Sequence, residues 1–359
     1  MNKMLKVLDR QKCPKDLWNK AVDEFSGAWA WHRWELLDAR ATWSRTNDKS
    51  FAVLDEQDAS RLVALIPLAL VLTKSAGFIF GPHLEGTGGP IIDDRIPRRT
   101  KDKVRAVIAG ELERLALMEK ARRIDFSCPP LATNFLSAST LLPNPLCHFG
   151  YTDTSTQTWL LDFSDKNEEQ LWNNLEHRCR KQIKKARRNQ LSASLVTPDR
   201  SMLDCYYALH LETCGRNNIP PHPVDYFSEI FGPISSAGLV KSCVVKSDTR
   251  TLAIHNFLIY KNSALYWTTA GSNDALKLCA NDFGIWHAIT EFSKSSIDYL
   301  ECGEAFPGAA DGKLKGLNDF KKSFGGTLYP YFRGQMIYRP VTESLMNIAR
   351  HLRQGRTKK

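Results

Sequence analysis

The feature that most constrains this chain is an order of structural signals that occurs twice. Arg61-Leu62-Val63-Ala64 opens an apolar strand pattern in the first half, and Thr251-Leu252-Ala253-Ile254 opens its counterpart in the second. Each half continues through a polar turn and a helical pattern into a strand, Ile124–Cys128 or Ile297–Cys302. Such a shared order indicates two copies of one supersecondary unit. We therefore expect an α/β (α+β) fold of two tandem lobes, each a mixed, mostly antiparallel sheet flanked by helices.

The length supports two lobes, because 359 residues exceed what one hydrophobic core usually serves. Pro143-Asn144-Pro145 and the polar stretch 152–158 indicate a boundary near residues 145–155. We expect an N-terminal lobe over 1–150, a C-terminal lobe with the reaction centre over 151–340, and a basic tail over 341–359.

Local patterns place the elements. Apolar spacing predicts helices over 14–42, 100–120, 166–190, 201–217 and 277–293. Strand patterns cover 50–54, 61–72, 192–196, 239–245, 251–260, 263–270 and 296–302. The glycine-rich stretch 81–90 lacks the Gly-Lys-Ser/Thr of a phosphate-binding loop, so we interpret it as a structural turn.

Composition excludes several classes of protein. The longest apolar run, Leu62–Leu72, is too short to cross a bilayer, which takes about 20 residues. The first residues lead straight into Asp9, Arg10 and Lys12 without a secretory signal, so we expect a cytoplasmic protein and leave peripheral membrane association open. None of the nine cysteines forms a CxxC pair and no histidines show ligand spacing, so we expect no metal site.

A basic segment is the most distinctive local feature. Between positions 178 and 188 seven cations occur without an acid, namely Arg178, Arg180, Lys181, Lys184, Lys185, Arg187 and Arg188. Their mutual repulsion favours a nearby anion, such as the phosphates of tRNA, a nucleotide-sugar or coenzyme A. A solvated helix face is the alternative interpretation.

Chemistry is also suggested at two later places. Lys321 and Lys322 lie between two phenylalanines before Gly325-Gly326, and an ammonium there could stabilise an oxyanion, although a solvated helix end is the simpler interpretation. Asp298, Glu301 and Glu304 cluster at a strand end, where α/β sheets bind ligands, and among them we favour Glu301 as proton acceptor. Solvated acids on a loop are the equally weighted alternative. Asn256 is interpreted as a polar contact or as a satisfied core residue.

Four segments carry a resemblance to a known family. They are Arg178–Arg188, Tyr266–Gly271, Ala280–Ile289 with Trp286, and Phe320-Lys321-Lys322-Ser323-Phe324-Gly325-Gly326. Together they resemble the FemAB-like branch of the GNAT superfamily, which includes peptidoglycan-bridge aminoacyltransferases and related N-acyltransferases. The resemblance spans about residues 25–340 and is best over 155–335. It implies tandem GNAT-like lobes, in agreement with the repeat.

The resemblance also implies acyl transfer to an amine, with aminoacyl-tRNA or acyl-CoA as co-substrate and no bound cofactor. By position, Lys321 would stabilise the transferring carbonyl and Phe320 would shape its pocket. Arg180 and Lys184 would hold phosphates. Tyr266 and Trp267 would line the acceptor channel. The chain departs from the acyl-CoA-binding pattern at 277–284, where a loop that is usually glycine-rich has one glycine.

The resemblance therefore implies an acyltransferase of the EC 2.3 type. It would move an acyl or aminoacyl group to an amine of a cell-envelope, polysaccharide or small-molecule acceptor. The alternative is a non-catalytic RNA-binding module on the same fold.

Overall fold

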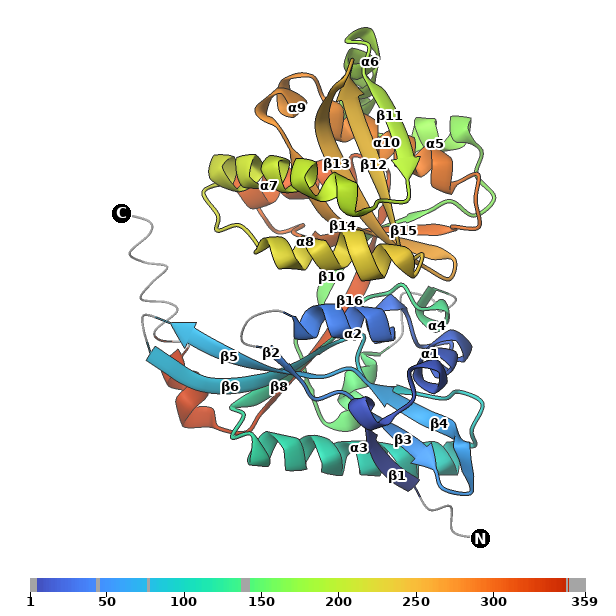
Figure 1. Ribbon diagram of the computed structural model, residues 1–359, viewed down its shortest axis with the longest axis vertical. Helices are drawn as coiled ribbons and strands as arrows, with labels where there is room; N and C mark the ends of the chain where they lie inside the picture. Colours follow the sequence, from blue (N-terminus) through green and yellow to red (C-terminus); the bar gives the residue numbers. More distant parts are fainter. Residues whose placement is uncertain (1–4, 43–45, 76–77, 137–142, 347, 349–359) are drawn as a thin grey trace. The chain divides into compact units, whose positions relative to one another are not determined.

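The structure, a computed structural model, describes residues 5–42, 46–75, 78–136, 143–346 and 348. They form two compact units (Figure 1). Unit 1 takes the chain up to Ser155 and again from Tyr331, and unit 2 takes Thr156–Pro330. The return to unit 1 lies before the expected boundary at 340/341 because strand β16 (Thr327–Ile337) pairs with a strand of unit 1.

Unit 1 contains two sheets. Their strand orders are β1-β3-β4-β7 and β16-β8-β6-β5-β2, and β9 pairs with β16. All neighbours are antiparallel except β6 and β8, which are parallel. The elements are β1 (Leu5–Asp9), α1 (Lys15–Glu24), α2 (Trp34–Ala41), β2 (Thr46–Asp48), β3 (Phe51–Asp55), β4 (Asp58–Ile66), β5 (Ala69–Ser75), β6 (Phe78–Thr87), β7 (Ile91–Ile92), α3 (Arg98–Met118), β8 (Arg123–Cys128), α4 (Thr133–Leu136) and β9 (Thr152–Asp153).

The predicted helix over 100–120 is confirmed as α3. Its buried face carries Val104, Ile108, Leu112 and Leu115, which recur at helical spacing and join the core of unit 1. A buried ion pair joins the helical residues 340–346 to the start of β8. Glu343, from the helical residues 340–346, accepts hydrogen bonds from both Arg122 and Arg123 at the start of β8.

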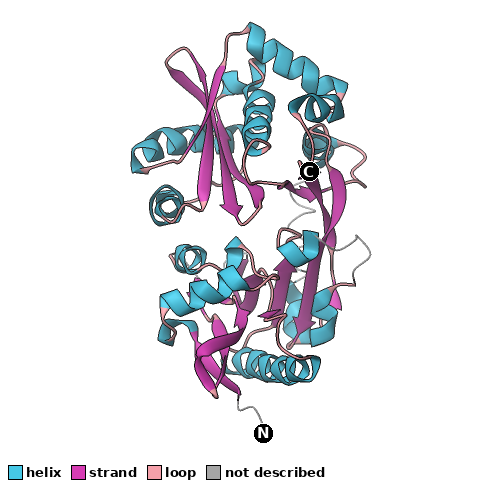
Figure 2. Cartoon of the chain, turned by 90° about the vertical axis from the view of Figure 1, so that its right-hand side faces the viewer, coloured by secondary structure: helices cyan, strands magenta, loops and turns pink. Residues whose placement is uncertain are grey.

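Unit 2 is built on one sheet of order β11-β12-β13-β14-β15-β10, antiparallel except for the parallel pair β14–β15 (Figure 2). Each unit therefore has the expected mixed, mostly antiparallel sheet flanked by helices. The elements are β10 (Thr156–Asp162), α5 (Glu168–Asn174), α6 (His177–Arg188), β11 (Ser192–Val196), α7 (Leu203–Asn217), α8 (Val224–Glu229), β12 (Val240–Ser247), β13 (Arg250–Tyr260), β14 (Ser263–Gly271), α9 (Asn273–Lys277), α10 (Ala280–Phe292), β15 (Tyr299–Ala305) and α11 (Gly312–Lys322).

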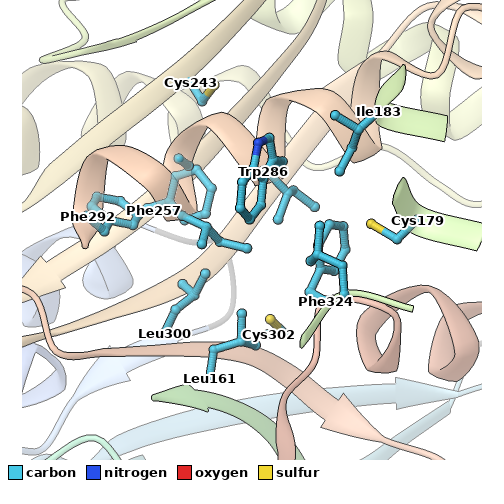
Figure 3. Close-up of a cluster of buried hydrophobic side chains, with 14 of the residues drawn as sticks. Leu161, Cys179, Ile183, Cys243, Phe257, Trp286, Phe292, Leu300, Cys302 and Phe324 are labelled. Carbon is cyan, nitrogen blue, oxygen red and sulfur yellow. The ribbon is translucent and has the colours of Figure 1, made fainter. Parts of the chain in front are cut away.

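The main core of unit 2 lies between the sheet and α6 and α10. Figure 3 shows Trp286 and Phe292 of α10 beside Phe257 of β13, with Ile183 of α6 at the same cluster. Successive strand residues point to opposite faces, so the sheet has an α10 face, which carries Phe257, and an opposite α7 face, against which α7 packs.

The duplication is confirmed by the order of elements. Unit 1 runs β3, β4, β5, β6, α3, β8, and unit 2 runs β12, β13, β14, α10, β15. In both units the strand after the long helix, β8 or β15, pairs in parallel with a strand that comes before that helix, β6 or β14. The difference lies at Pro67, where the predicted strand 61–72 is wrong as one element. Proline cannot continue a ladder, so β4 and β5 separate there and join different sheets.

Two further predictions of local structure are wrong. The stretch 81–90 is mostly strand β6, because β5 and β8 pair with it from both sides and override its turn-forming residues. The helix over 166–190 is two helices, α5 and α6. Leu175 and Glu176 adopt extended backbone between them, and the Glu176 N–H donates to the carbonyl of Ser323, outside either helix. In the described part of the chain, no helix has the length and apolarity that a membrane span requires.

Candidate active site

Strands β14 and β15 separate part-way along their length. They pair only where Ser263–Leu265 faces Tyr299–Glu301, and both strands continue further, to Gly271 and Ala305. Glu301 is thus the last residue of the parallel pair on β15. Ligands of α/β sheets bind at the carboxyl ends of parallel strands, so this separation is a candidate site.

Glu301 has the environment of a proton acceptor. Its carboxyl group is 1% exposed, and Oε1 accepts a hydrogen bond of 2.9 Å from the Thr158 hydroxyl of β10. Oε2 has no hydrogen-bond partner among the described residues. Burial raises the pKa of Glu301 to about 7, and the Thr158 bond and the Lys321 charge oppose that rise. A carboxyl with a pKa near neutrality is suited to accept a proton under physiological conditions.

Lys321 lies against the continuation of the same strand. Its Nζ donates to the carbonyl oxygen of Glu304 at 2.8 Å and lies 6.0 Å from the centre of the Phe306 ring. Burial lowers the pKa of Lys321, while the nearby Cys302 and Glu301 act in the opposite direction. The ammonium is therefore placed beside the separated part of β15, and electrostatically coupled to Glu301.

A glycine bulge makes room for this lysine. Between the pairs Leu160–Glu301 and Thr158–Glu304, β10 has one residue and β15 has two, so β15 bulges there. Gly303 in the bulge has φ +84°, and a Cβ at that position would lie 3.2 Å from Nζ of Lys321. Any other residue would be strained and would crowd the ammonium.

Asn318 fixes helix α11 in this place, and the sequence analysis did not identify it. Its Oδ1 accepts hydrogen bonds from the Trp159 indole N–H at 3.0 Å and from the Phe306 backbone N–H at 2.9 Å. It thereby ties α11 to β10 and to the loop after β15, one helical turn before Lys321. In the sequence it is one polar residue in a lysine-rich helix, and no local pattern distinguishes it.

The basic segment folds as α6, and its cations are exposed or half-buried. Within the described chain none of the seven forms an ion pair with a carboxylate, and α6 itself contains no acid. A shallow groove along the helix is lined by His177, Arg180, Lys181, Lys184, Arg187 and Arg188. Arg180 donates to the carbonyl of Asn173 at 3.0 Å, which orients it, and Lys184 extends into solvent.

The start of α6 meets the end of α11. Besides the bond from Glu176 N–H to the Ser323 carbonyl (2.9 Å), Lys322 Nζ lies 3.6 Å from the Glu176 carboxylate. Gly325 has φ +84°, and a Cβ there would lie 2.6 Å from the carbonyl oxygen of Asn174. Only glycine allows this close approach of two backbones. The basic helix and Lys321 are therefore built into one region of unit 2.

The other predicted substrate-binding residues are divided between the two faces of the sheet. Tyr266 follows Leu265, the partner of Glu301, so Tyr266 and Glu301 point to opposite faces. The Tyr266 hydroxyl lies 3.1 Å from Nδ1 of His255, and burial lowers the pKa of that imidazole to about 4, which keeps it neutral. Phe320 packs partly buried against the core on the α10 face.

Trp267 and Asn256 complete the predicted set. Trp267 is the extra residue of a bulge in β14, and its ring contacts Tyr226 of α8 with 6.1 Å between centroids. Asn256 is buried on the α7 face, where it accepts from Ser242 at 2.6 Å and donates to Thr268 at 3.0 Å. Both ends of its amide are bonded within the protein. The predicted binding roles of Tyr266, Trp267, Asn256 and Phe320 stay predictions.

In unit 1 the chain takes a different path at the corresponding strand ends, next to a pocket whose lining includes Pro90, Ile91 and Cys128. The parallel pair β6–β8 ends at Thr87 and Ser127, and the Gly88 N–H donates to the Ser127 carbonyl at 2.8 Å. Gly89 has φ +72°, and a Cβ there would lie 2.4 Å from Sγ of Cys128. The chain thus crosses directly over the strand end. Among the described residues of both units, no cluster of three or more His, Cys, Asp or Glu could hold a metal ion.

Comparison with known proteins agrees with this architecture. Residues 174–322 match the model of an acetyltransferase (GNAT) domain. No protein with a curated description matches the sequence.

Three solved structures resemble the chain. FemX has a TM-score of 0.67 at 14% identity, over 96% of this chain and 99% of that one. A tandem GNAT protein from the clavulanic acid biosynthesis pathway has a TM-score of 0.53 at 12% identity, over 93% and 98%. The C-terminal domain (DUF2156) of a protein named as a lysylphosphatidylglycerol synthetase from Agrobacterium fabrum has a TM-score of 0.52 at 15% identity, over 78% and 84%.

These likenesses confirm the predicted tandem GNAT fold and the resemblance to the FemAB-like branch. The acetyltransferase domain match falls within unit 2 and contains Glu301 and Lys321. It confirms the predicted acyltransferase class and leaves the acyl donor open.

Proposed function

We propose that this chain is an N-acyltransferase or aminoacyltransferase whose reaction takes place where β14 and β15 separate. It would transfer a group from a phosphate-bearing carrier to an amine of a cell-envelope, polysaccharide or small-molecule acceptor. The observation that carries this proposal is the pair formed by Glu301, with a pKa of about 7 and a free Oε2, and the neighbouring ammonium of Lys321.

The two residues would divide the chemistry of amide formation. Oε2 of Glu301 accepts a proton from the acceptor ammonium, directly or through one water, and leaves a neutral amine. The amine nitrogen attacks the carbonyl carbon of the ester or thioester, and the Lys321 ammonium stabilises the oxyanion that forms. Collapse of this intermediate breaks the bond to the carrier, and the oxygen or sulfur of the carrier takes up the proton that the attacking nitrogen loses. Glu301 then releases its own proton to solvent. Positioning and charge stabilisation supply the rate, so the reaction forms no covalent enzyme intermediate.

The carrier that best fits α6 is a polyanion. Helix α6 has 12 residues and so is about 18 Å long. Its cations lie along that length without carboxylate partners among the described residues, a span that exceeds one pyrophosphate and fits several nucleic-acid phosphates. Aminoacyl-tRNA would therefore occupy α6 with its acceptor end, and Arg180 and Lys184 would contact its backbone.

The start of α10 also favours aminoacyl-tRNA over acyl-CoA as the donor. A coenzyme A pyrophosphate would bind backbone N–H groups at a helix N-terminus. Here the first turn of α10 carries Asp282, and burial raises the pKa of this carboxyl to about 6 even though the Arg178 charge opposes the rise. At neutral pH Asp282 is mostly ionised and would repel the pyrophosphate. Acyl-CoA is thus the second choice as donor.

A second candidate function rests on α6 alone. The same basic helix would serve an RNA-binding module without catalysis. It predicts salt-dependent RNA binding and no product with any donor.

A donor and acceptor screen separates these proposals. The donors are bulk tRNA charged with labelled amino acids, and acetyl-CoA; the acceptors are UDP-linked amino sugars and lysine-containing peptides. Lys321→Ala should lower kcat by a factor on the order of 10²–10³ with little change in stability. The neighbouring Lys322→Ala, which removes an exposed ammonium from the same turn, is the matched control and should stay near wild type. Wild-type turnover of Lys321→Ala would contradict the role of this lysine.

A further inference from the structure

We propose that Thr158 is a positioning residue that holds the Glu301 carboxylate in its working orientation and sets the pH at which it accepts protons. The inference rests on the proposed function. It starts from the hydrogen bond of 2.9 Å between Thr158 Oγ1 and Glu301 Oε1. Thr158 is 0% exposed, so water does not compete for this bond.

The sheet geometry explains why Thr158 reaches Glu301. Leu160 is the direct partner of Glu301, so the two side chains share one face, and Thr158, two positions earlier on β10, points to that face as well. In a regular ladder Thr158 would be a diagonal neighbour. The extra residue of β15, in the bulge at Cys302–Gly303, changes the local register and lets the Thr158 hydroxyl contact Oε1.

The bond leaves the two carboxylate oxygens with different tasks. Oε1 is occupied by Thr158, whereas Oε2 has no partner among the described residues. Threonine is branched at Cβ and its χ1 is restricted, so the hydroxyl is held in one place. A carboxylate fixed at one oxygen cannot rotate both oxygens into the site, and Oε2 remains the oxygen that meets the amine.

The same bond acts on the proton affinity of Glu301. A hydroxyl can donate to the ionised carboxylate and stabilises that form. Burial raises the pKa of Glu301, whereas the Thr158 hydrogen bond and the charge of Lys321 both lower it. Without the hydroxyl, the carboxyl group stays protonated to higher pH and cannot take a proton from the acceptor amine there.

Thr158→Val tests this directly, because valine has nearly the same shape and lacks the donor. A hydrogen bond to a charged group corresponds to about one to two pKa units. The Glu301 titration should therefore shift up by about that amount. The acid limb of the kcat/KM profile should shift with it, which lowers the rate on that limb about 10- to 100-fold while the plateau at high pH is retained. Thr158→Ser restores the hydroxyl and should return both values to near wild type.

Two measurements distinguish a failure of this inference from a failure of the proposed function. The first is a carbon NMR titration of the full chain labelled at the glutamate carboxyl carbons, in which Glu301→Gln assigns the Glu301 signal; it needs no substrate. The second is the pH profile of transfer with the donor and acceptor found in the screen above. If Thr158→Val is not folded, Thr158→Ala removes the hydroxyl without adding bulk.

The outcomes are distinct. A shift of both the NMR titration and the acid limb supports the positioning role. An unchanged Glu301 titration in the variant overturns it, whatever the activity. A shifted titration with an unmoved acid limb overturns the assignment of Glu301 as the base, and with it the catalytic part of the inference.

Discussion

The strongest test of the donor assignment is to remove charge from α6 at constant fold. The change is Lys181→Gln, Lys184→Gln and Arg188→Gln in one chain. All three side chains are exposed, line the groove and make no hydrogen bond within the described protein. Glutamine has a helix propensity close to that of lysine and arginine, so α6 should remain folded.

The expected effect follows from counterion release. Each cation that neutralises a phosphate contributes about 0.7–0.9 to the slope of log affinity against log salt. Three cations should therefore reduce the slope by about 2–3, so that the ratio of wild-type to variant affinity falls about 20- to 40-fold between ~50 and ~200 mM salt. A ligand with one pyrophosphate cannot contact cations spread over the whole helix, and its slope should change by about one unit or less.

The assay is fluorescence anisotropy with labelled bulk tRNA over a series of salt concentrations, with coenzyme A as the second ligand. The matched control is Arg98→Gln, Arg99→Gln and Lys246→Gln, exposed cations of α3 and β12 that lie outside α6. Both triple variants lower the formal charge by three from +10. Equal tRNA slopes for the two variants would refute the reasoning, because net charge rather than α6 would then govern binding. Loss of coenzyme A binding with unchanged tRNA binding would reverse the choice of donor.

Three further predictions concern single residues. Burial raises the pKa of Glu301 from 4.5 to about 7, so the native state is destabilised increasingly as pH rises through this interval and not below it. Glu301→Gln should therefore gain up to ~3 kcal/mol of stability over wild type from pH 4.5 to pH 7, measured by urea unfolding at several pH values, and a pH-independent difference would contradict the pKa. Glu343→Gln leaves Arg122 buried without its ion pair and should lower the stability of unit 1 by about 3–5 kcal/mol. Hydrogen exchange should show early loss of protection in α3 and β8 but not in unit 2, and equal loss in both units would contradict this. Gly325→Ala should destabilise unit 2 by about 1–3 kcal/mol, because Gly325 has a φ of +84° and lies close to the Asn174 carbonyl. The control, Gly316→Ala at a solvent-facing position of α11, should be neutral or stabilising. Thermal melts compare the two variants, and equal melting temperatures would argue against the close contact.

The sequence was sufficient for those parts of the molecule that depend on local periodicity. The face of α3 and the cations of α6 follow from spacing along one helix. The strand order repeated in the two halves identified the duplication. Glu301 could be chosen because a strand end in an α/β unit is a general place for ligands, an argument that needs no knowledge of neighbours.

What the sequence could not predict depends on register between distant strands. β10 begins within the polar stretch 152–158 that indicated a boundary, and its first residues become part of a strand through their pairing with β15. Thr158 and Asn318 act through bonds that span 143 and 159 residues. A bulge of one residue decides which side chains meet, and no local signal encodes it apart from Gly303. The break at Leu175 likewise depends on a bond to Ser323.

The path of the chain also bears on how the protein is made. Unit 2 is an uninterrupted segment placed between β9 and β16, and these two strands pair with each other, Thr152 opposite Gln335. Both ends of the segment therefore emerge side by side from unit 1. During synthesis the ribosome completes the whole of unit 2 before it releases β16 and Glu343, which unit 1 needs to fill its sheet and neutralise Arg122. Unit 2, which carries the proposed catalytic residues, is thus expected to mature first, while unit 1 waits for its last strand.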